Sequence, residues 1–194
     1  MIRITGGHLR GRQLKGELPA GVRPTAGRTR EALFSMVGQD LEGWSMLDLF
    51  GGSGLIAIEA ASRGAAPVHI CEQNGKVIRY LRAQLDSLGV QAKVWEGDAL
   101  RLPLPTVDFV FADPPYDNDR KNWLPRAASL TERLLVAEGR HGGTWPEEVG
   151  SLKLDRVRSY GEAELALYVG AGTEASETEV AIVSDDLGVI KDDR

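Results

Sequence analysis

Several features that define common classes of protein are missing from this chain of 194 residues. Its one cysteine, Cys71, excludes an internal disulfide and a cysteine-cluster zinc site, and it fits a reducing compartment. No apolar run reaches the roughly 18 residues that a membrane span needs, and the first residues lack the apolar segment of a secretory signal. The three histidines are scattered without the spacing of metal ligands. We therefore expect a cytoplasmic, monomeric protein without a metal or a membrane contact.

The charges that are present are distributed unevenly along the chain. Residues 1–40 hold seven basic residues against three acidic ones, whereas residues 171–194 hold two basic residues against seven acidic ones. The composition of this last segment predicts an acidic, weakly ordered tail. The basic N-terminal segment is a candidate surface for a polyanion, although solvated surface charge is the simpler interpretation.

Short apolar runs alternate with helical patterns from residue 44 onward, which is typical of a parallel sheet wrapped by helices. The sequence predicts a Rossmann-like α/β fold in which a seven-stranded, mostly parallel sheet has helices on both faces. Strands are expected at 45–50, 68–72, 92–95, 107–112, 134–138, 152–159 and 163–169. Helices are expected at 28–37, 55–63, about 77–88 and 120–131. Residues 1–20 should form a small β ribbon or an extended arm.

A glycine turn follows the first expected strand. Gly51, Gly52 and Gly54 would let the backbone approach a ligand closely, and the helix that follows presents free N–H groups. Asp48 lies in the apolar strand before the turn, where a buried acid needs a partner such as a ligand ammonium or the loop's own amides. The turn also matches the loose dinucleotide-binding pattern, so a nicotinamide enzyme remains possible at this step.

Acidic residues also follow the second and third strands. Glu72, 18 residues after Gly54, could accept hydrogen bonds from both hydroxyls of a ribose, or it could be a solvated strand end. Asp98 and the N–H of Ala99 could recognise an adenine ring, or they could form a plain turn. Because the carboxyl ends of parallel strands meet in one crevice, these residues predict a site for a nucleoside-bearing cofactor.

The fourth strand ends in Asp113-Pro114-Pro115-Tyr116, a motif that suits methylation of a planar amino nitrogen and has no use in hydride transfer. The Asp113 carboxylate and the Pro114 carbonyl could each accept one N–H of the amine, which would turn its lone pair toward the methyl donor. The prolines fix the backbone, and Tyr116 could stack on a flat base. The simpler interpretation is a loop with an aromatic packing residue.

With these motifs the chain resembles class I S-adenosylmethionine-dependent methyltransferases, and within them the bacterial family that methylates N2 of a guanine in 16S ribosomal RNA. The resemblance covers residues 2 to about 170. Its more specific marks are the segments RITGG (3–7), RGR (10–12), RPT (23–25), RTREALF (28–34), EA (59–60), SRGA (62–65) and YG (160–161). It implies a basic extension at 1–22 and a methyltransferase domain at 23–170, whereas the acidic tail at 171–194 departs from the family's pattern.

The resemblance also implies roles for individual residues. The cofactor S-adenosylmethionine would be held by Asp48, Gly51, Gly52, Gly54, Glu72, Asp98 and Ala99. The catalytic residues that hold the target base would be Asp113, Pro114 and Tyr116. The residues expected to contact 16S ribosomal RNA, in the small subunit or its precursor, are Arg3, Arg10, Arg12, Arg23, Arg28 and Arg30.

Two other functions fit the same motifs. An adenine N6-methyltransferase acting on DNA or RNA uses a similar acid-Pro-Pro-aromatic loop, although the near-neutral body of this chain contains no large DNA-reading insertion. A non-catalytic RNA-binding assembly factor could keep the fold without the chemistry. The complete loop from Asp113 to Tyr116 argues against that last possibility.

Overall fold

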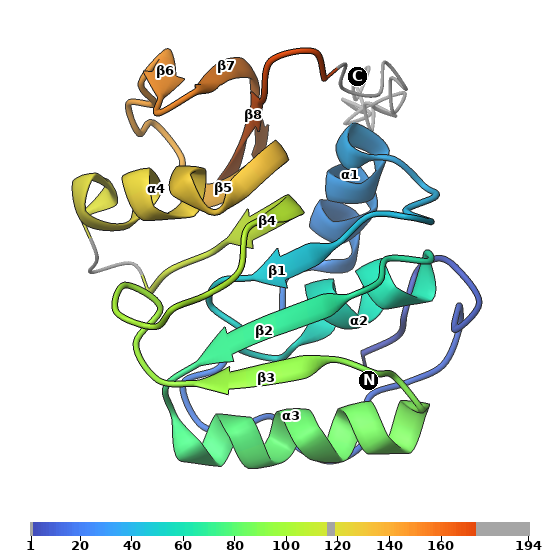
Figure 1. Ribbon diagram of the computed structural model, residues 1–194. Helices are drawn as coiled ribbons and strands as arrows, with labels where there is room; N and C mark the ends of the chain where they lie inside the picture. Colours follow the sequence, from blue (N-terminus) through green and yellow to red (C-terminus); the bar gives the residue numbers. More distant parts are fainter. Residues whose placement is uncertain (1, 116–118, 174–194) are drawn as a thin grey trace, which may run out of the picture.

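The computed structural model describes residues 2–115 and 119–173, and these form one mixed sheet of eight strands with helices on both faces (Figure 1). The strand order is β3-β2-β1-β4-β5-β8-β7-β6. The parallel strands are β1 (Met46–Asp48), β2 (Val68–Glu72), β3 (Lys93–Glu96), β4 (Val107–Ala112) and β5 (Thr131–Arg140). The antiparallel strands are β6 (Glu148–Val149), β7 (Leu152–Tyr160) and β8 (Ala163–Val169).

The predicted fold is confirmed, with two differences in the sheet. The short strand β6 lies in a segment where the sequence indicated only a loop, because two residues pairing with β7 leave no periodic pattern to detect. Strand β5 is longer than expected and pairs with β4 on one side and with β8 on the other. The pairing with β8 extends the strand to Gly139 and Arg140, which have no apolar pattern of their own.

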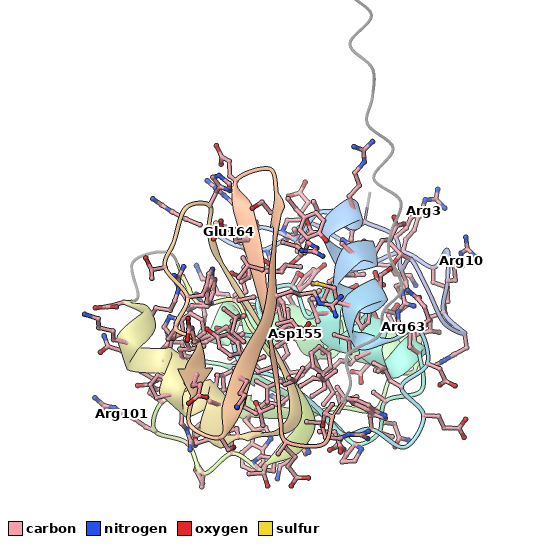
Figure 2. The ribbon with its side chains drawn as sticks, turned by 90° about the horizontal axis from the view of Figure 1, so that it is seen from above. Arg3, Arg10, Arg63, Arg101, Asp155 and Glu164 are labelled. Carbon is pink, nitrogen blue, oxygen red and sulfur yellow. The ribbon has the colours of Figure 1, made fainter. Side chains whose placement is uncertain are left out.

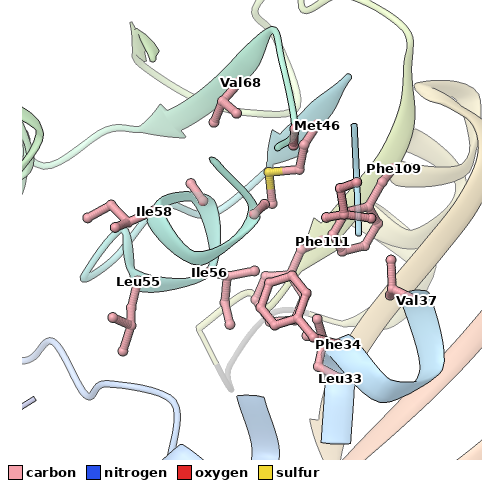
Figure 3. Packing of buried hydrophobic residues seen from close by; sticks show 14 of the residues in the cluster. Leu33, Phe34, Val37, Met46, Leu55, Ile56, Ile58, Val68, Phe109 and Phe111 are labelled. Carbon is pink, nitrogen blue, oxygen red and sulfur yellow. The ribbon is translucent and has the colours of Figure 1, made fainter. Parts of the chain in front are cut away.

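Four helices cover the sheet, and the alternation of buried residues along β4 shows which face each one covers. Phe109 and Phe111 belong to the same core as α1 (Gly27–Val37), α2 (Leu55–Ser62) and α3 (Gly75–Leu88). Val110 and Ala112 point to the opposite face and pack with α4 (Arg120–Ser129). Figure 3 shows the first of these cores, with Phe34 of α1 beside Phe111.

The N-terminal arm folds back onto α2 and belongs to the same core. Arg3 and Gln13 form an isolated antiparallel bridge, and Ile4, Leu9 and Leu14 are buried in the core that also contains apolar residues of α1, α2 and α3. The arm is therefore a short ribbon, as expected, whose apolar side chains hold it against the domain. Among the helices in the described parts of the chain, none combines the length and the apolar character that a bilayer crossing requires.

The parallel order brings the ends of five strands to one edge of the sheet. Asp48 and Glu72 are the last residues of β1 and β2, Asp98 is the second residue after β3, and Asp113 comes directly after β4. In the register of β4 and β5, Ala112 pairs with Ala137, so the next residues, Asp113 and Glu138, follow in neighbouring positions. Five acidic side chains thus share the edge where open α/β sheets bind their ligands.

Candidate active site

A cavity of about 690 Å³ opens at this edge, a size that suits a small-molecule ligand. Part of its lining is the glycine turn and the start of α3, and another part is the loop after β4 with Glu138 of β5. The segment 20–26, which precedes α1, and the turn between β7 and β8 close the remaining sides. Of the residues predicted to hold a ligand, Gly52, Glu72, Asp98, Ala99, Asp113, Pro114 and Arg23 line this cavity.

The three glycines of the turn have different roles. Gly52, with φ +48°, lines the cavity. Gly51 and Gly54 let the turn pack closely, since a Cβ on Gly51 would lie 2.5 Å from Ile70 Cγ2 and a Cβ on Gly54 would lie 2.2 Å from Leu81 Cδ2. Gly54 also adopts φ +71° where α2 begins. The turn can therefore form only with small residues at these positions.

Glu72 is held in place by the backbone of both adjoining loops. Its Oε2 accepts the N–H of Gly52 at 3.0 Å, and its Oε1 accepts the N–H groups of Gln73 and Asn74, each at 2.8 Å. A carboxylate offers about four acceptor positions, so the group retains capacity for a ribose hydroxyl. Glu72 thus fixes the shape of the cavity wall and presents an oriented acceptor to a ligand.

Asp98 forms a turn and also lines the cavity. Its Oδ1 accepts the N–H of Leu100 at 2.9 Å, and its Oδ2 lies 3.3 Å from Nε of Arg101. These contacts show the turn, while recognition of an adenine ring stays a prediction. Asp98 organises the loop, and the adjacent Ala99, which is buried, also lines the cavity.

Asp48 is a buried acid with an unfilled acceptor. Its side chain is 2% exposed, and its Oδ1 has no hydrogen-bond partner among the described residues. Burial raises its pKa well above the ordinary value, the backbone N–H of Phe50 opposes this shift, and the charges of Asp113 and Glu72 add to it. Such a group favours a ligand that brings a positive charge or an N–H donor.

Asp113 and Glu138 are two further acidic residues, which lie in neighbouring positions and line the cavity. Burial raises the pKa of Asp113 to about 6. Glu138 is 7% exposed, and burial together with the charge of Asp113 raises its pKa to about 8. Its Oε2 has no hydrogen-bond partner within residues 2–115 and 119–173. Tyr116, which was predicted to stack on the base, lies outside the described residues.

The predicted RNA contacts divide into exposed arginines and one buried arginine. Arg3, Arg10, Arg12, Arg23 and Arg28 are exposed, and Figure 2 shows Arg3 and Arg10 extending outward on the same side of the molecule. The prediction for Arg30 was wrong. Its side chain is buried, with Nε 2.7 Å from Glu59 Oε1 and the remaining nitrogens donating to the carbonyls of Thr25 and Arg3. It is not available to a phosphate.

Comparison with known proteins assigns the chain to a family. The family model described as conserved hypothetical protein 95 matches residues 2–169. Ribosomal RNA small subunit methyltransferase D of Escherichia coli (strain K12) is 31% identical over 179 residues, covering 86% of this chain and 89% of that protein. The solved structure of yhhF from Escherichia coli has a TM-score of 0.74 at 31% identity, covering 87% of this chain and 97% of the other. This chain belongs to the conserved hypothetical protein 95 family.

The family assignment confirms the resemblance found in the sequence. A more distant structure, an RNA methyltransferase from Salinibacter ruber in complex with S-adenosyl-L-homocysteine, has a TM-score of 0.61 at 18% identity and covers 78% of this chain and 97% of its own. At this identity the likeness shows the fold alone. The architecture of this family member is thus the one seen in a structure that holds the demethylated methyl donor.

Glu59 is the centre of a buried ionic cluster. It is fully buried in α2 and accepts hydrogen bonds from the backbone N–H and hydroxyl of Thr5 and from Arg30, and its Oε2 lies 3.5 Å from Nη2 of Arg63 in an ion pair. The cluster joins the arm, α1 and α2. Nothing in the sequence indicated this cluster, because Glu59 is 54 residues from Thr5 and 29 from Arg30.

Sequence reasoning also missed part of the cavity lining. Thr25 and Tyr160 were noticed only as marks of the family, yet both line the cavity. Glu138 was overlooked, although an acid within an apolar strand is the same signal that identified Asp48. In the part of the chain that the structure describes, no three His, Cys, Asp or Glu side chains are grouped so that they could hold a metal ion.

Proposed function

We propose that this chain transfers a methyl group from S-adenosylmethionine to the exocyclic N2 of one guanine in small-subunit (16S) ribosomal RNA. The single observation that supports this most is that Asp113 and Pro114 line the same cavity as Gly52 and Glu72. A nucleoside-binding wall and an amine-holding loop then face the same space. The relationship to the Escherichia coli enzyme gives the substrate class.

The first wall suits the methyl donor. Glu72 is oriented by three backbone N–H groups and would hold the ribose, while Ala99 and Asp98 would border the adenine. Asp48, whose Oδ1 has no partner among the described residues, would receive the ammonium group. When bound, the donor supplies a methyl group on a positively charged sulfur, and the acidic edge of the sheet favours that charge.

The second wall suits the target amine. The Asp113 carboxylate and the Pro114 carbonyl would each accept one N–H, which orients the nitrogen lone pair into the cavity. With a pKa of about 6, Asp113 is mostly ionised at pH 7 and can accept these bonds. The same raised pKa makes it a better acceptor than an ordinary aspartate for the proton that the amine releases after methylation.

The exposed arginines provide the proposed route to the RNA. Arg23 stands at the cavity, and Arg3, Arg10, Arg12 and Arg28 continue the positive charge along the arm and the start of α1. Contacts of this kind position a nucleic acid through its phosphates without reading the bases. We further propose that residues 1–22 act as the RNA-binding extension of the domain at 23–170, and that the protein works as a cytoplasmic monomer.

Product analysis tests this function. The protein is incubated with methyl-labelled cofactor and small subunits from cells that lack the modification, with naked 16S RNA, or with DNA, and the labelled nucleoside is identified. We expect N2-methylguanosine from the subunits or the ribosomal RNA. N6-methyladenosine as the product would instead support the alternative enzyme, and cofactor binding without any turnover would support the assembly factor.

A further inference from the structure

Glu138 lines the cavity next to Asp113, and the proposed reaction does not use it. It lies in β5, one strand away from Asp113, and the residues just before the two acids, Ala112 and Ala137, are paired in the sheet. The side chain is 7% exposed and lines the cavity, yet its Oε2 has no partner among the described residues. A buried acceptor left in this state costs stability unless a ligand supplies the donor.

A neighbouring acid shows that this part of the fold can satisfy a buried carboxylate. Glu164 of β8 is as little exposed as Glu138, but its Oε1 accepts the N–H of Gly142 at 2.9 Å and its Oε2 accepts the indole N–H of Trp145 at 3.1 Å. Those contacts lower the pKa of Glu164 despite its burial. Protein donors thus satisfy both oxygens of Glu164, whereas Oε2 of Glu138, a residue that lines the cavity, has no partner among the described residues.

The target base supplies the matching groups. In guanine, N1–H is next to the N2 amino group on the Watson–Crick edge, and the O6 acceptor is next to N1. A carboxyl group accepts N1–H through one oxygen in either protonation state, and when it keeps its proton the other oxygen donates to O6. Adenine held by its amino group presents an acceptor at N1, which leaves the carbonyl oxygen of the acid without a donor.

We propose that Glu138 reads the Watson–Crick edge of the target guanine at N1–H and O6, while Asp113 and Pro114 hold N2. This inference rests on the proposed function and adds the residue that selects guanine over adenine. The raised pKa of Glu138, about 8, favours the protonated form that matches both edge atoms. A site that hydrogen-bonds a substrate N–H discriminates strongly against a base that lacks it.

Two substitutions distinguish a Glu138 that forms hydrogen bonds to the base from a Glu138 that acts through its negative charge. Glu138→Gln keeps a carbonyl acceptor and an N–H donor in nearly the same shape as the protonated acid. Glu138→Leu keeps a similar volume and removes both. On small subunits that lack the modification, we expect kcat/KM to fall by roughly 10²-fold or more for the leucine variant, as for other lost preorganised contacts, and by less than about tenfold for the glutamine variant. The Kd for S-adenosylmethionine should stay near the wild-type value in both.

The kcat/KM values of the two variants, taken together, test the inference. A glutamine variant as inactive as the leucine variant would show that the negative charge is needed and would overturn the reading role, as would full activity in both. Because the wild-type product is identified in the same assay, a wild-type product other than N2-methylguanosine would mean that the proposed function had failed instead.

A base analogue tests the same claim if the leucine variant does not fold. 2-Aminopurine keeps the N2 amino group but has neither N1–H nor O6, so it is placed at the mapped target nucleotide of the substrate RNA. The wild-type enzyme should methylate it roughly 10²-fold more slowly than guanine, the loss expected for contacts that the site can no longer make. Equal rates on the two bases would overturn the proposal.

Discussion

Two buried glutamates in this molecule stand in opposite environments. Glu59, fully buried between the arm, α1 and α2, receives hydrogen bonds from Thr5 and Arg30 and lies in an ion pair with Arg63. Glu138, nearly as buried at the carboxyl edge of the sheet, has an oxygen without a partner among the described residues, and its close charged neighbour, Asp113, has the same sign. Each acid directly follows a run of four apolar residues, 55–58 in α2 and 134–137 in β5.

The different environments of the two glutamates indicate that one supports the fold and the other serves the function. A buried charge with several donors holds segments together, and removing any member leaves the others unsatisfied. A buried acid without donors destabilises the fold and persists where a ligand uses it. We infer that the Glu59 cluster attaches the basic arm to the domain, and that the acids of the strand edge serve the reaction.

Substituting Glu59 should produce the largest effect. Glu59→Ala leaves Arg30 and Arg63 buried without their carboxylate, so we expect the free energy of unfolding to fall by about 3–5 kcal/mol. Urea denaturation measures the change, with Glu138→Gln as the matched control, which should cost little or increase stability. Equal losses in the two variants would remove the distinction between the two acids.

Substituting Asp113 should affect turnover without affecting cofactor binding. Asp113→Ala removes the acceptor that orients the amine, and we expect kcat to fall by roughly 10²-fold or more, the usual size for a lost preorganised contact. Calorimetry should give a Kd for S-adenosylmethionine close to that of the wild type. Unchanged turnover would show that the loop after β4 does not hold the amine.

The pH dependence of stability tests whether Glu138 lacks donors in the free protein. Its folded-state pKa of about 8 lies above the ordinary value of 4.5, so the folded state holds the proton more tightly than the unfolded state does. The stability of the wild type relative to Glu138→Gln should therefore decrease as pH rises from about 4.5 to 8, because the folded state then loses this advantage. Asp113 remains in both proteins. A constant difference between their free energies of unfolding across this range would contradict the raised pKa.

Removing single exposed arginines should have the smallest effect. Arg10→Ala or Arg23→Ala should raise KM for the RNA substrate several-fold and reduce its salt dependence by about one phosphate contact, with kcat little changed. Lys153→Ala, which removes the same charge from an exposed position on β7, serves as the control. A control with the same effect would show that only the total charge matters.

Elements with a periodic pattern of apolar residues could be predicted from the sequence, and so could motifs whose residues are adjacent in the chain. The strands 68–72 and 107–112 and the turn of three glycines were located from short patterns, because each depends on adjacent residues. The Glu59 cluster and the pairing of Asp113 with Glu138 depend on contacts between distant segments. That is also why Arg30 was assigned to the RNA surface, since nothing near it in the sequence reveals its partner in α2.

The structure of a complex with S-adenosyl-L-homocysteine would show whether the cavity at the strand ends holds the methyl donor beside the amine-holding loop. We expect the ribose to lie on Glu72, the amino-acid end to lie near Asp48, and the sulfur to face Asp113 in the cavity. A ligand bound elsewhere on the molecule, or one with its sulfur turned away from the loop after β4, would contradict it.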